Sequence, residues 1–170
     1  SILQYHFFAF EGWKSSKSNK DYQRYVEVIK NQINLLVKNK DKEETIDFIE
    51  RFSRELKESF TVIRKLFENP PNSFQDILAL QRVANFYPLL MKAYKYDKSD
   101  GKVIFEKVAK SLEIFSFRIY GMRRWRSNSA SDRLYRMARD FKGEFNQLIL
   151  DLKELLNNYC DDKHFINSLT

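Results

Sequence analysis

A long helix is predicted by residues 41–67, DKEETIDFIERFSRELKESFTVIRKLF. Asp41, Glu43 and Glu44 suit its start, because carboxylates there meet free backbone N–H groups and the positive end of the helix dipole. After this start, apolar residues recur every three or four positions, which places them along one face of the helix. They are Ile46, Ile49, Phe52, Leu56, Phe60, Ile63 and Phe67. Such a stripe is typical of the seam of a helical bundle.

Helical periodicity extends over most of the remaining sequence, with breaks at capping and turn residues. The other expected helices cover residues 2–10, 20–38, 74–96, 102–120 and 130–159, followed by a short one after 161 or 162. Pro70 and Pro71 interrupt a helix because proline lacks the N–H donor, and Pro88 is expected to kink the helix over 74–96. Gly121 is expected to end the helix over 102–120 in a left-handed cap. Six or seven helices with short loops predict an all-α fold, a single helical bundle or array.

Composition supports the same fold class. The 170 residues include 4 glycines and 3 prolines, few of the turn residues that a many-stranded sheet needs. The length is that of one ordinary domain, so residues 1–170 are expected to form a single α-helical domain around one core. The sequence starts without methionine and inside an apolar run. We therefore expect it to be a fragment of a larger multidomain protein.

The expected location is a reducing cytoplasm. Cys160 is the only cysteine of the sequence, so an intramolecular disulfide is impossible, and nothing resembles a secretory signal. The apolar start Ile2–Phe10 is too short to span a bilayer. No membrane partner is therefore expected.

The sequence motifs of common enzyme classes are missing. The four glycines lie 20 or more residues apart, so no phosphate-cradling glycine loop can form, and there is no Gly-x-Ser-x-Gly elbow. His6 lies in an apolar stretch and is interpreted as a packed histidine. Cys160 and His164 are four residues apart, but two ligands make a weak metal site. We predict no catalytic residue, no metal site, no cofactor and no small-molecule ligand, and hence a non-enzymatic domain.

Positive charge is concentrated between Arg118 and Lys142. This stretch of 25 residues holds eight basic and two acidic residues, and seven of the twelve arginines of the chain. The planar guanidinium binds phosphate or carboxylate through two hydrogen bonds, so this enrichment suggests recognition of an anion. The candidate residues for contacting a nucleic acid or a protein partner are Arg118, Arg123, Arg124, Trp125, Arg126, Arg133, Arg136 and Arg139.

On a helical wheel, Arg133, Arg136 and Arg139 fall on the side away from Leu134, Ala138 and the other apolar residues. Three interpretations of this basic face remain open. It can be a solvated surface with local ion pairs, a site for nucleic-acid phosphates, or a contact for an acidic surface of another domain or subunit. Trp125 can stack on a base or anchor its loop in the core.

Three runs of the sequence stand out together: Asn85-Phe-Tyr-Pro-Leu-Leu-Met-Lys-Ala-Tyr94, Phe115-Ser-Phe-Arg-Ile-Tyr120 and Arg126-Ser-Asn-Ser-Ala-Ser-Asp-Arg-Leu-Tyr135. They resemble the helical middle region of the GmrSD-like family of bacterial DNA-restriction and phage-defence proteins. The opening Leu3-Gln-Tyr-His-Phe-Phe is similar to the segment that follows the first domain of that family. The resemblance covers most of the chain and rests on helical patterns and short motifs.

The resemblance implies a connecting helical module. In that family a ParB-like, nucleotide-using domain with an Asp-Gly-Gln-Gln-Arg motif precedes this region, and an HNH-like nuclease domain follows it. The present sequence contains neither the Asp-Gly-Gln-Gln-Arg motif nor a paired-histidine nuclease motif. The expected function is a non-catalytic connecting domain of a nucleotide-dependent restriction endonuclease, with its flanking domains as partners and with arginines that contact DNA phosphates. The alternative is a protein-interaction or scaffold domain whose basic face packs on an acidic partner.

Overall fold

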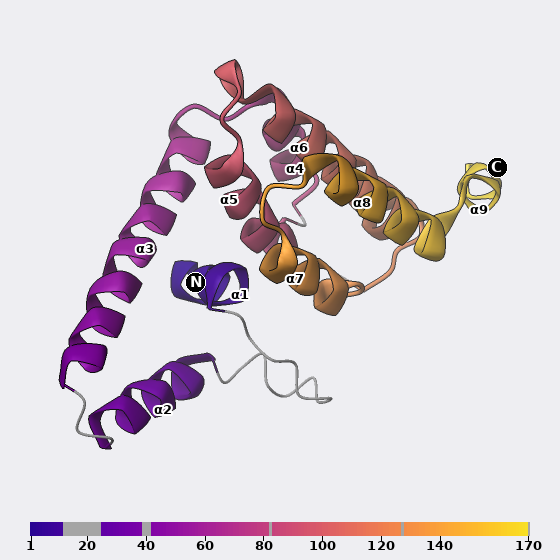
Figure 1. Cartoon of the computed structure of the whole chain (residues 1–170). Coiled ribbons are helices and arrows are strands. Elements are labelled where there is room, and N and C mark those ends of the chain that lie inside the picture. The colour runs from indigo at the N-terminus through magenta and orange to yellow at the C-terminus, as the bar shows by residue number, and fades with distance from the viewer. Residues whose placement is uncertain (12–24, 39–41, 82, 127, 170) are drawn as a thin grey trace.

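In the computed structural model, residues 1–11, 25–38, 42–81, 83–126 and 128–169 are described, and these residues form helices and no β-strand. The α-helices are α1 (Ile2–Phe10), α2 (Tyr25–Lys38), α3 (Lys42–Glu68), α4 (Asn72–Ala79), α5 (Tyr87–Tyr96), α6 (Val103–Phe115), α7 (Ser131–Asp140), α8 (Phe145–Cys160) and α9 (Asp162–Asn167) (Figure 1). Two 3-10 turns, η2 (Ala84–Phe86) and η3 (Asp100–Lys102), and a π-helical turn, η4 (Ser116–Met122), complete them. The predicted all-α class is confirmed. None of these helices combines the length and the apolar character that a membrane crossing requires.

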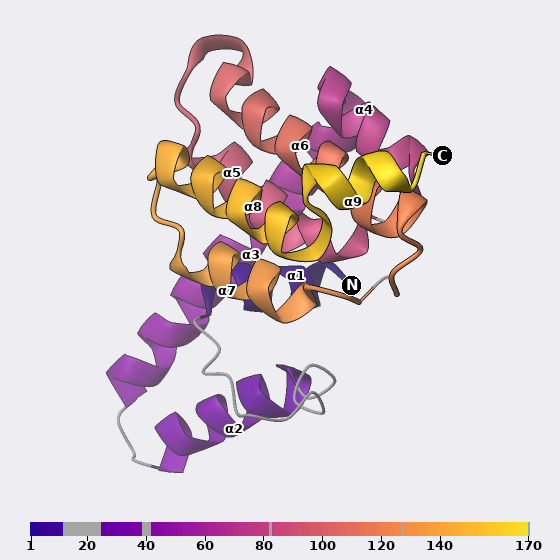
Figure 2. The same cartoon turned by 90° about the vertical axis from the view of Figure 1, so that its right-hand side faces the viewer.

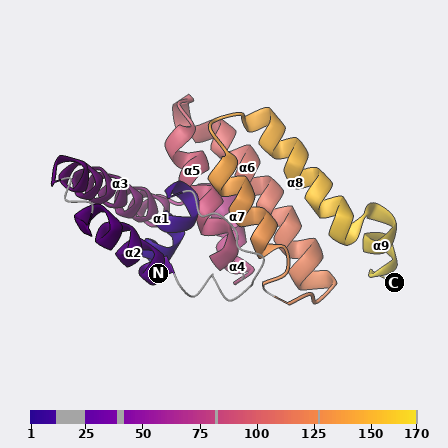
Figure 3. The ribbon, with the colours of Figure 1, turned by 60° about the horizontal axis from the view of Figure 1, so that its bottom comes forward.

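The main core lies between α4, α5, α6, α7 and α8, together with the C-terminal end of α3. Aromatic rings are prominent in it, because they bury large apolar areas and pack edge to face. Phe86 meets Phe115 at 6.1 Å between ring centroids, and Phe115 meets Tyr120 at 5.9 Å. Along the molecule, α2 and α3 lie at one end and α8 and α9 at the other (Figure 3).

Helix α3 leaves this body, and its N-terminal half pairs with α2 to form a protruding helical hairpin (Figure 2). A second, smaller apolar cluster joins the hairpin to α1 through Phe7, Phe8 and Ile29. The predicted seam of α3 is only partly correct. Ile63 is buried, whereas Ile46, Ile49, Phe60 and Phe67 are exposed. The reason is that most of α3 has neighbours on one side only, so a complete apolar stripe exceeds the surface that α1, α2 and α5 can cover.

The predicted helix over residues 74–96 is two helices. Helix α4 ends at Ala79, and η2 leads directly into α5 at Tyr87. Pro88 does not kink a continuous helix; it lies in the first turn of α5, where the missing N–H donor costs nothing. Pro71 is the N-cap of α4 and makes no side-chain cap bond.

The predicted longest helix, over residues 130–159, is likewise divided. Helix α7 ends at Asp140 and α8 begins at Phe145, with Gly143 between them at a φ of +116°. This backbone conformation is open to glycine and strained for other residues, so the chain turns here. Such divisions explain why the described residues form nine α-helices where six or seven were expected. The longest described helix is α3, with 27 residues.

The remaining boundaries follow the sequence more closely. The helix predicted over 102–120 corresponds to α6 and its π-helical extension η4. Gly121 lies inside η4 and does not have a positive φ, so the predicted left-handed cap is wrong. The start at Asp41, the loop over 14–19 and residues 20–24 of the second predicted helix lie outside the described residues.

The turn between α5 and α6 is held by a buried carboxylate. Asp97 accepts hydrogen bonds from the backbone N–H of Ser99 and of Phe105, each at 2.7 Å, and from the Ser99 hydroxyl at 2.6 Å. Burial raises the pKa of Asp97, but these bonds outweigh it and hold the pKa below its ordinary value. The carboxylate therefore satisfies backbone donors at the start of α6 and joins α5 to it.

Candidate functional site

Helix α7 carries three of the predicted arginines, and Lys92 of α5 holds the C-terminal end of this helix. The Lys92 side chain is only 2% exposed, and its Nζ donates hydrogen bonds to the carbonyl oxygens of Ala138 and Arg139, both at 2.7 Å. Carbonyls in the last turn of a helix have no N–H partner within the helix. Burial lowers the pKa of Lys92 to about 8. A buried amine thus fixes the position of α7 relative to α5.

Two of the predicted arginines are paired within the chain. Arg118 donates to Asp162 at 2.6 Å, and its guanidinium lies 4.4 Å from the ring centroid of Phe165. It thereby attaches α9 to η4. Arg139 forms two hydrogen bonds with the neighbouring Asp140, at 2.6 and 2.7 Å. The hydrogen bond from Arg139 lowers the pKa of Asp140. These two guanidiniums have carboxylate partners and are poorly placed to bind another anion.

A second group lies in the loop that leads from η4 to α7. Arg123, Arg124 and Arg126 are exposed, and no ion pair to them is found among the described residues. Arg124 has a φ of +52°, in the left-handed region. Trp125 is 42% exposed and packs edge to face on Tyr159 of α8, at 5.5 Å between ring centroids. The ring therefore anchors the loop on α8 and keeps a solvent-accessible part.

Backbone bonds keep the loop close to the body. The Trp125 N–H donates to the carbonyl oxygen of Ile119 at 3.1 Å, and the Ser129 N–H donates to that of Arg126 at 2.9 Å. The Tyr120 hydroxyl donates to the Ser129 carbonyl at 2.7 Å. The three exposed guanidiniums are thus presented by a loop that is fastened at both ends.

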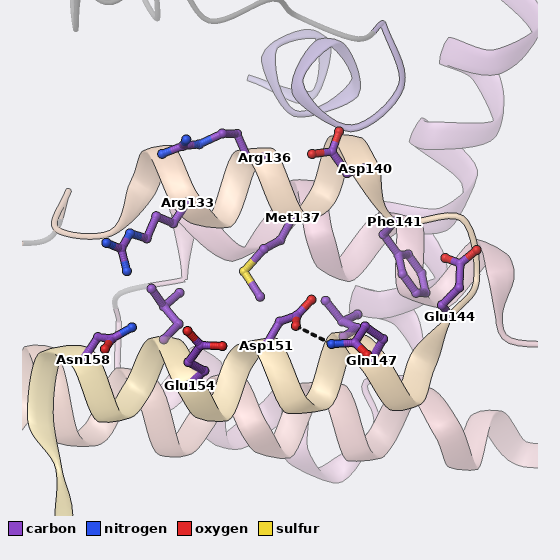
Figure 4. A pocket seen from close by; sticks show the side chains of 12 residues that line it. Arg133, Arg136, Met137, Asp140, Phe141, Glu144, Gln147, Asp151, Glu154 and Asn158 are labelled. Atoms are coloured by element: carbon purple, nitrogen blue, oxygen red, sulfur yellow. Dashed lines mark hydrogen bonds between the residues drawn. The ribbon is translucent and has the colours of Figure 1, made fainter.

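Arg133 and Arg136 lie in a third environment, a groove of about 750 Å³ between α7 and α8. Figure 4 shows Arg133 and Met137 extending from α7 toward α8, while Asp151 and Glu154 extend from α8 toward α7. The lining residues are Arg133, Arg136, Met137, Asp140, Phe141, Glu144, Gln147, Leu148, Asp151, Glu154, Leu155 and Asn158. Four carboxylates and two guanidiniums share this groove, so its net charge is negative.

The eight predicted residues therefore occupy three environments and do not share one basic face. The helical wheel of α7 is correct in one respect: Leu134 and Ala138 are fully buried, and Arg133 and Arg136 are exposed. The sequence did not reveal the acidic wall opposite Arg133, because that wall belongs to a separate helix whose orientation depends on the turn at Gly143.

Sequence reasoning also missed a buried polar cluster at the junction of α1 and α3. His6 is fully buried, and its Nδ1 lies 2.8 Å from the Ser59 hydroxyl. Within the described ranges, the side chains spaced closely enough to share a metal ion are His6, Glu11 and Glu55. Cys160 and His164 are not brought together in this way. The sequence contains no local signal for the cluster, because 53 residues separate His6 from Ser59.

No protein-family model matches this chain, and neither a curated protein nor a solved structure matches it.

Proposed function

We propose that this chain is a non-catalytic helical connecting domain of a GmrSD-like DNA-restriction protein, and that the loop from Arg123 to Arg126 contacts DNA phosphates. The family is proposed from the short motifs of the sequence. The DNA contact is supported chiefly by one observation: Arg123, Arg124 and Arg126 are all exposed without an ion pair among the described residues, while Arg118 and Arg139 are paired with aspartates.

The loop is better suited to a polyanion than the groove is. A phosphate approaching Arg133 meets the carboxylates of Asp151 and Glu154 on the opposite wall. A phosphate approaching the loop meets three guanidiniums that have no ion pair among the described residues, and their binding releases counterions from the DNA. The exposed part of Trp125 lies beside these groups and can stack on an unpaired base.

The test is a fluorescence-anisotropy titration of a short labelled duplex at two salt concentrations. Three phosphate contacts give a slope of about −2.7 in log affinity against log salt, so affinity falls about 40-fold between about 50 and 200 mM salt. Replacing Arg123, Arg124 and Arg126 together by glutamine is expected to abolish most of this binding and to flatten its salt dependence.

A matched control removes the same charge from α3. Arg54, Arg64 and Lys65 are also exposed and lie on a helix outside the loop, so their joint replacement by glutamine is expected to leave binding nearly unchanged. No binding of the parent chain at low salt, or an equal loss in both triple variants, contradicts the DNA contact.

The groove between α7 and α8 favours a second candidate function, binding of a protein segment. Its mixed charges and its apolar floor of Leu148 and Leu155 suit a polypeptide that carries basic and apolar side chains. In a longer protein that contains the flanking domains, this candidate expects the amides of α7 and α8 beside the groove to exchange hydrogen more slowly than in the present chain. Equal exchange rates contradict it.

A further inference from the structure

The buried cluster at the junction of α1 and α3 contains a histidine nitrogen that has no hydrogen-bond partner among the described residues. His6 Nδ1 lies 2.8 Å from Ser59 Oγ, and His6 Nε2 lies 3.7 Å from Glu11 Oε1. The second distance is too long for a hydrogen bond. Nε2 is buried and makes no hydrogen bond within the part of the chain that the structure describes, although buried ring nitrogens are almost always paired.

The hydrogen bonds of Ser59 bear on which nitrogen of the His6 ring carries a hydrogen. The Ser59 hydroxyl donates to the backbone carbonyl of Glu55 at 3.1 Å, which uses its single hydrogen. In the tautomer that carries its hydrogen on Nδ1, His6 donates to Ser59 Oγ, and the lone pair of Nε2 faces the carboxylate of Glu11. In that tautomer, the repulsion between the lone pair and the carboxylate is relieved by a proton on Nε2 or by a metal ion, and a metal ion also engages the nearby carboxylate of Glu55. The arrangement therefore fits a cation bound to both groups.

A cationic group already lies at the outer side of this site. One terminal nitrogen of Arg51 is 3.2 Å from the Glu11 carboxylate and 2.9 Å from that of Glu55. A second guanidinium nitrogen lies 3.3 Å from Glu11, and the guanidinium also lies over the Phe48 ring. The Arg51 side chain is 39% exposed, so it has room to turn toward solvent when these contacts are released.

From this geometry we infer that His6 Nε2, Glu11 and Glu55 bind a divalent transition-metal ion, with Arg51 displaced outward. The ligand atoms of the three side chains lie within 4.8 Å of one another. Ligands of a tetrahedral zinc ion, each about 2.0–2.1 Å from the metal, are separated by about 3.4 Å. The His6–Glu11 spacing of 3.7 Å is close to this value, and Glu55 reaches it by a small rotation of a partly exposed side chain.

The donor set indicates the class of metal. An imidazole nitrogen with two carboxylates suits Zn²⁺ or Mn²⁺, whereas Mg²⁺ and Ca²⁺ prefer oxygen ligands alone. Ser59 orients the His6 ring, because its bond to Nδ1 leaves Nε2 to bind the metal. The ion would connect the end of α1 with the middle of α3. This site is independent of the arginine loop and of the proposed DNA contact.

Calorimetric titration of the metal-free chain with Zn²⁺ and with Mn²⁺ tests the inference, and Co²⁺ provides an optical probe of the ligands. We expect one ion per chain and a higher melting temperature in its presence. Glu55→Gln removes a ligand at a partly exposed position and is expected to weaken binding by about tenfold or more. Arg51→Gln removes the competing positive charge and is expected to tighten binding.

His164→Gln is the matched control. The sequence holds only two histidines, and His164 is exposed and pairs with Asp161, so it is the natural position for adventitious binding. Unchanged binding in this variant, together with a shift of the His6 ring resonances on adding Zn²⁺, supports the site. Lack of binding in both the parent and the Arg51→Gln chain overturns the inference, as does binding that is lost in His164→Gln and kept in Glu55→Gln.

Discussion

Replacing Lys92 by methionine should change how the stability of this protein depends on pH. Methionine keeps the length and the apolar stem of the side chain, but it removes the amine that binds the carbonyl oxygens of Ala138 and Arg139. Because the pKa of Lys92 is about 8 in the folded chain and 10.5 in the unfolded chain, the unfolded state binds more protons between these values. The free energy of unfolding of the parent therefore rises with pH in this window.

The size of the effect follows from the two pKa values. One pKa unit corresponds to about 1.36 kcal/mol, so between about pH 7 and 9.5 the parent gains about 2 kcal/mol over Lys92→Met. Lys92→Met also lacks the two hydrogen bonds at every pH and leaves two carbonyl oxygens unpaired, which lowers its free energy of unfolding by about 1–3 kcal/mol for each oxygen. The gap between the two proteins is thus larger at high pH than at neutral pH.

Urea unfolding followed by circular dichroism, repeated at several pH values, measures this gap. Lys107→Met is the matched control, because it makes the same change at an exposed lysine of α6 and should keep the pH dependence of the parent. Parallel curves for the parent and Lys92→Met would show that Lys92 does not titrate in a buried environment. That result would refute the account of how α7 is held.

Two further stability predictions follow from the turns of the fold. Asp97→Ala leaves backbone donors of Ser99 and Phe105 unpaired and should cost about 2–4 kcal/mol in urea unfolding. Because its pKa is lowered in the folded chain, the contribution of Asp97 is complete well above 3.8 and disappears at lower pH, so the parent and Asp97→Ala should converge in acid. Gly143→Ala should cost about 1–3 kcal/mol because of its positive φ, although the added Cβ meets no clash. Gly121→Ala has similar space and no positive φ, and a comparable loss in that variant would contradict this reasoning.

Several features could be predicted because they depend on neighbouring residues. The periodicity of α3 identified a long helix, and the apolar positions Leu134 and Ala138 of α7 are buried as expected. Pro88 shows the limit of such reasoning. A proline inside an apolar periodic run is compatible both with a kinked helix and with the first turn of a new one. Only the packing of η2 and α5 in the core selects the second.

Charged residues show the same limit more clearly. The concentration of arginines between 118 and 142 is a property of the sequence. Their partners are not, since Arg118 binds Asp162, which is 44 residues away. Whether a guanidinium is available to an outside anion depends on which carboxylates the fold brings near it.

The sequence by itself determined that this protein is helical and where its positive charge is concentrated, because helix periodicity and composition involve residues within a few positions of one another. The tertiary structure decided which face of α3 is buried, where the chain turns at Gly143 and which arginines pair with carboxylates. It also decided that His6 meets Ser59 and Glu11 in one buried cluster. Contacts between helices distant in sequence depend on how their side chains fit in space, and no local pattern specifies that fit.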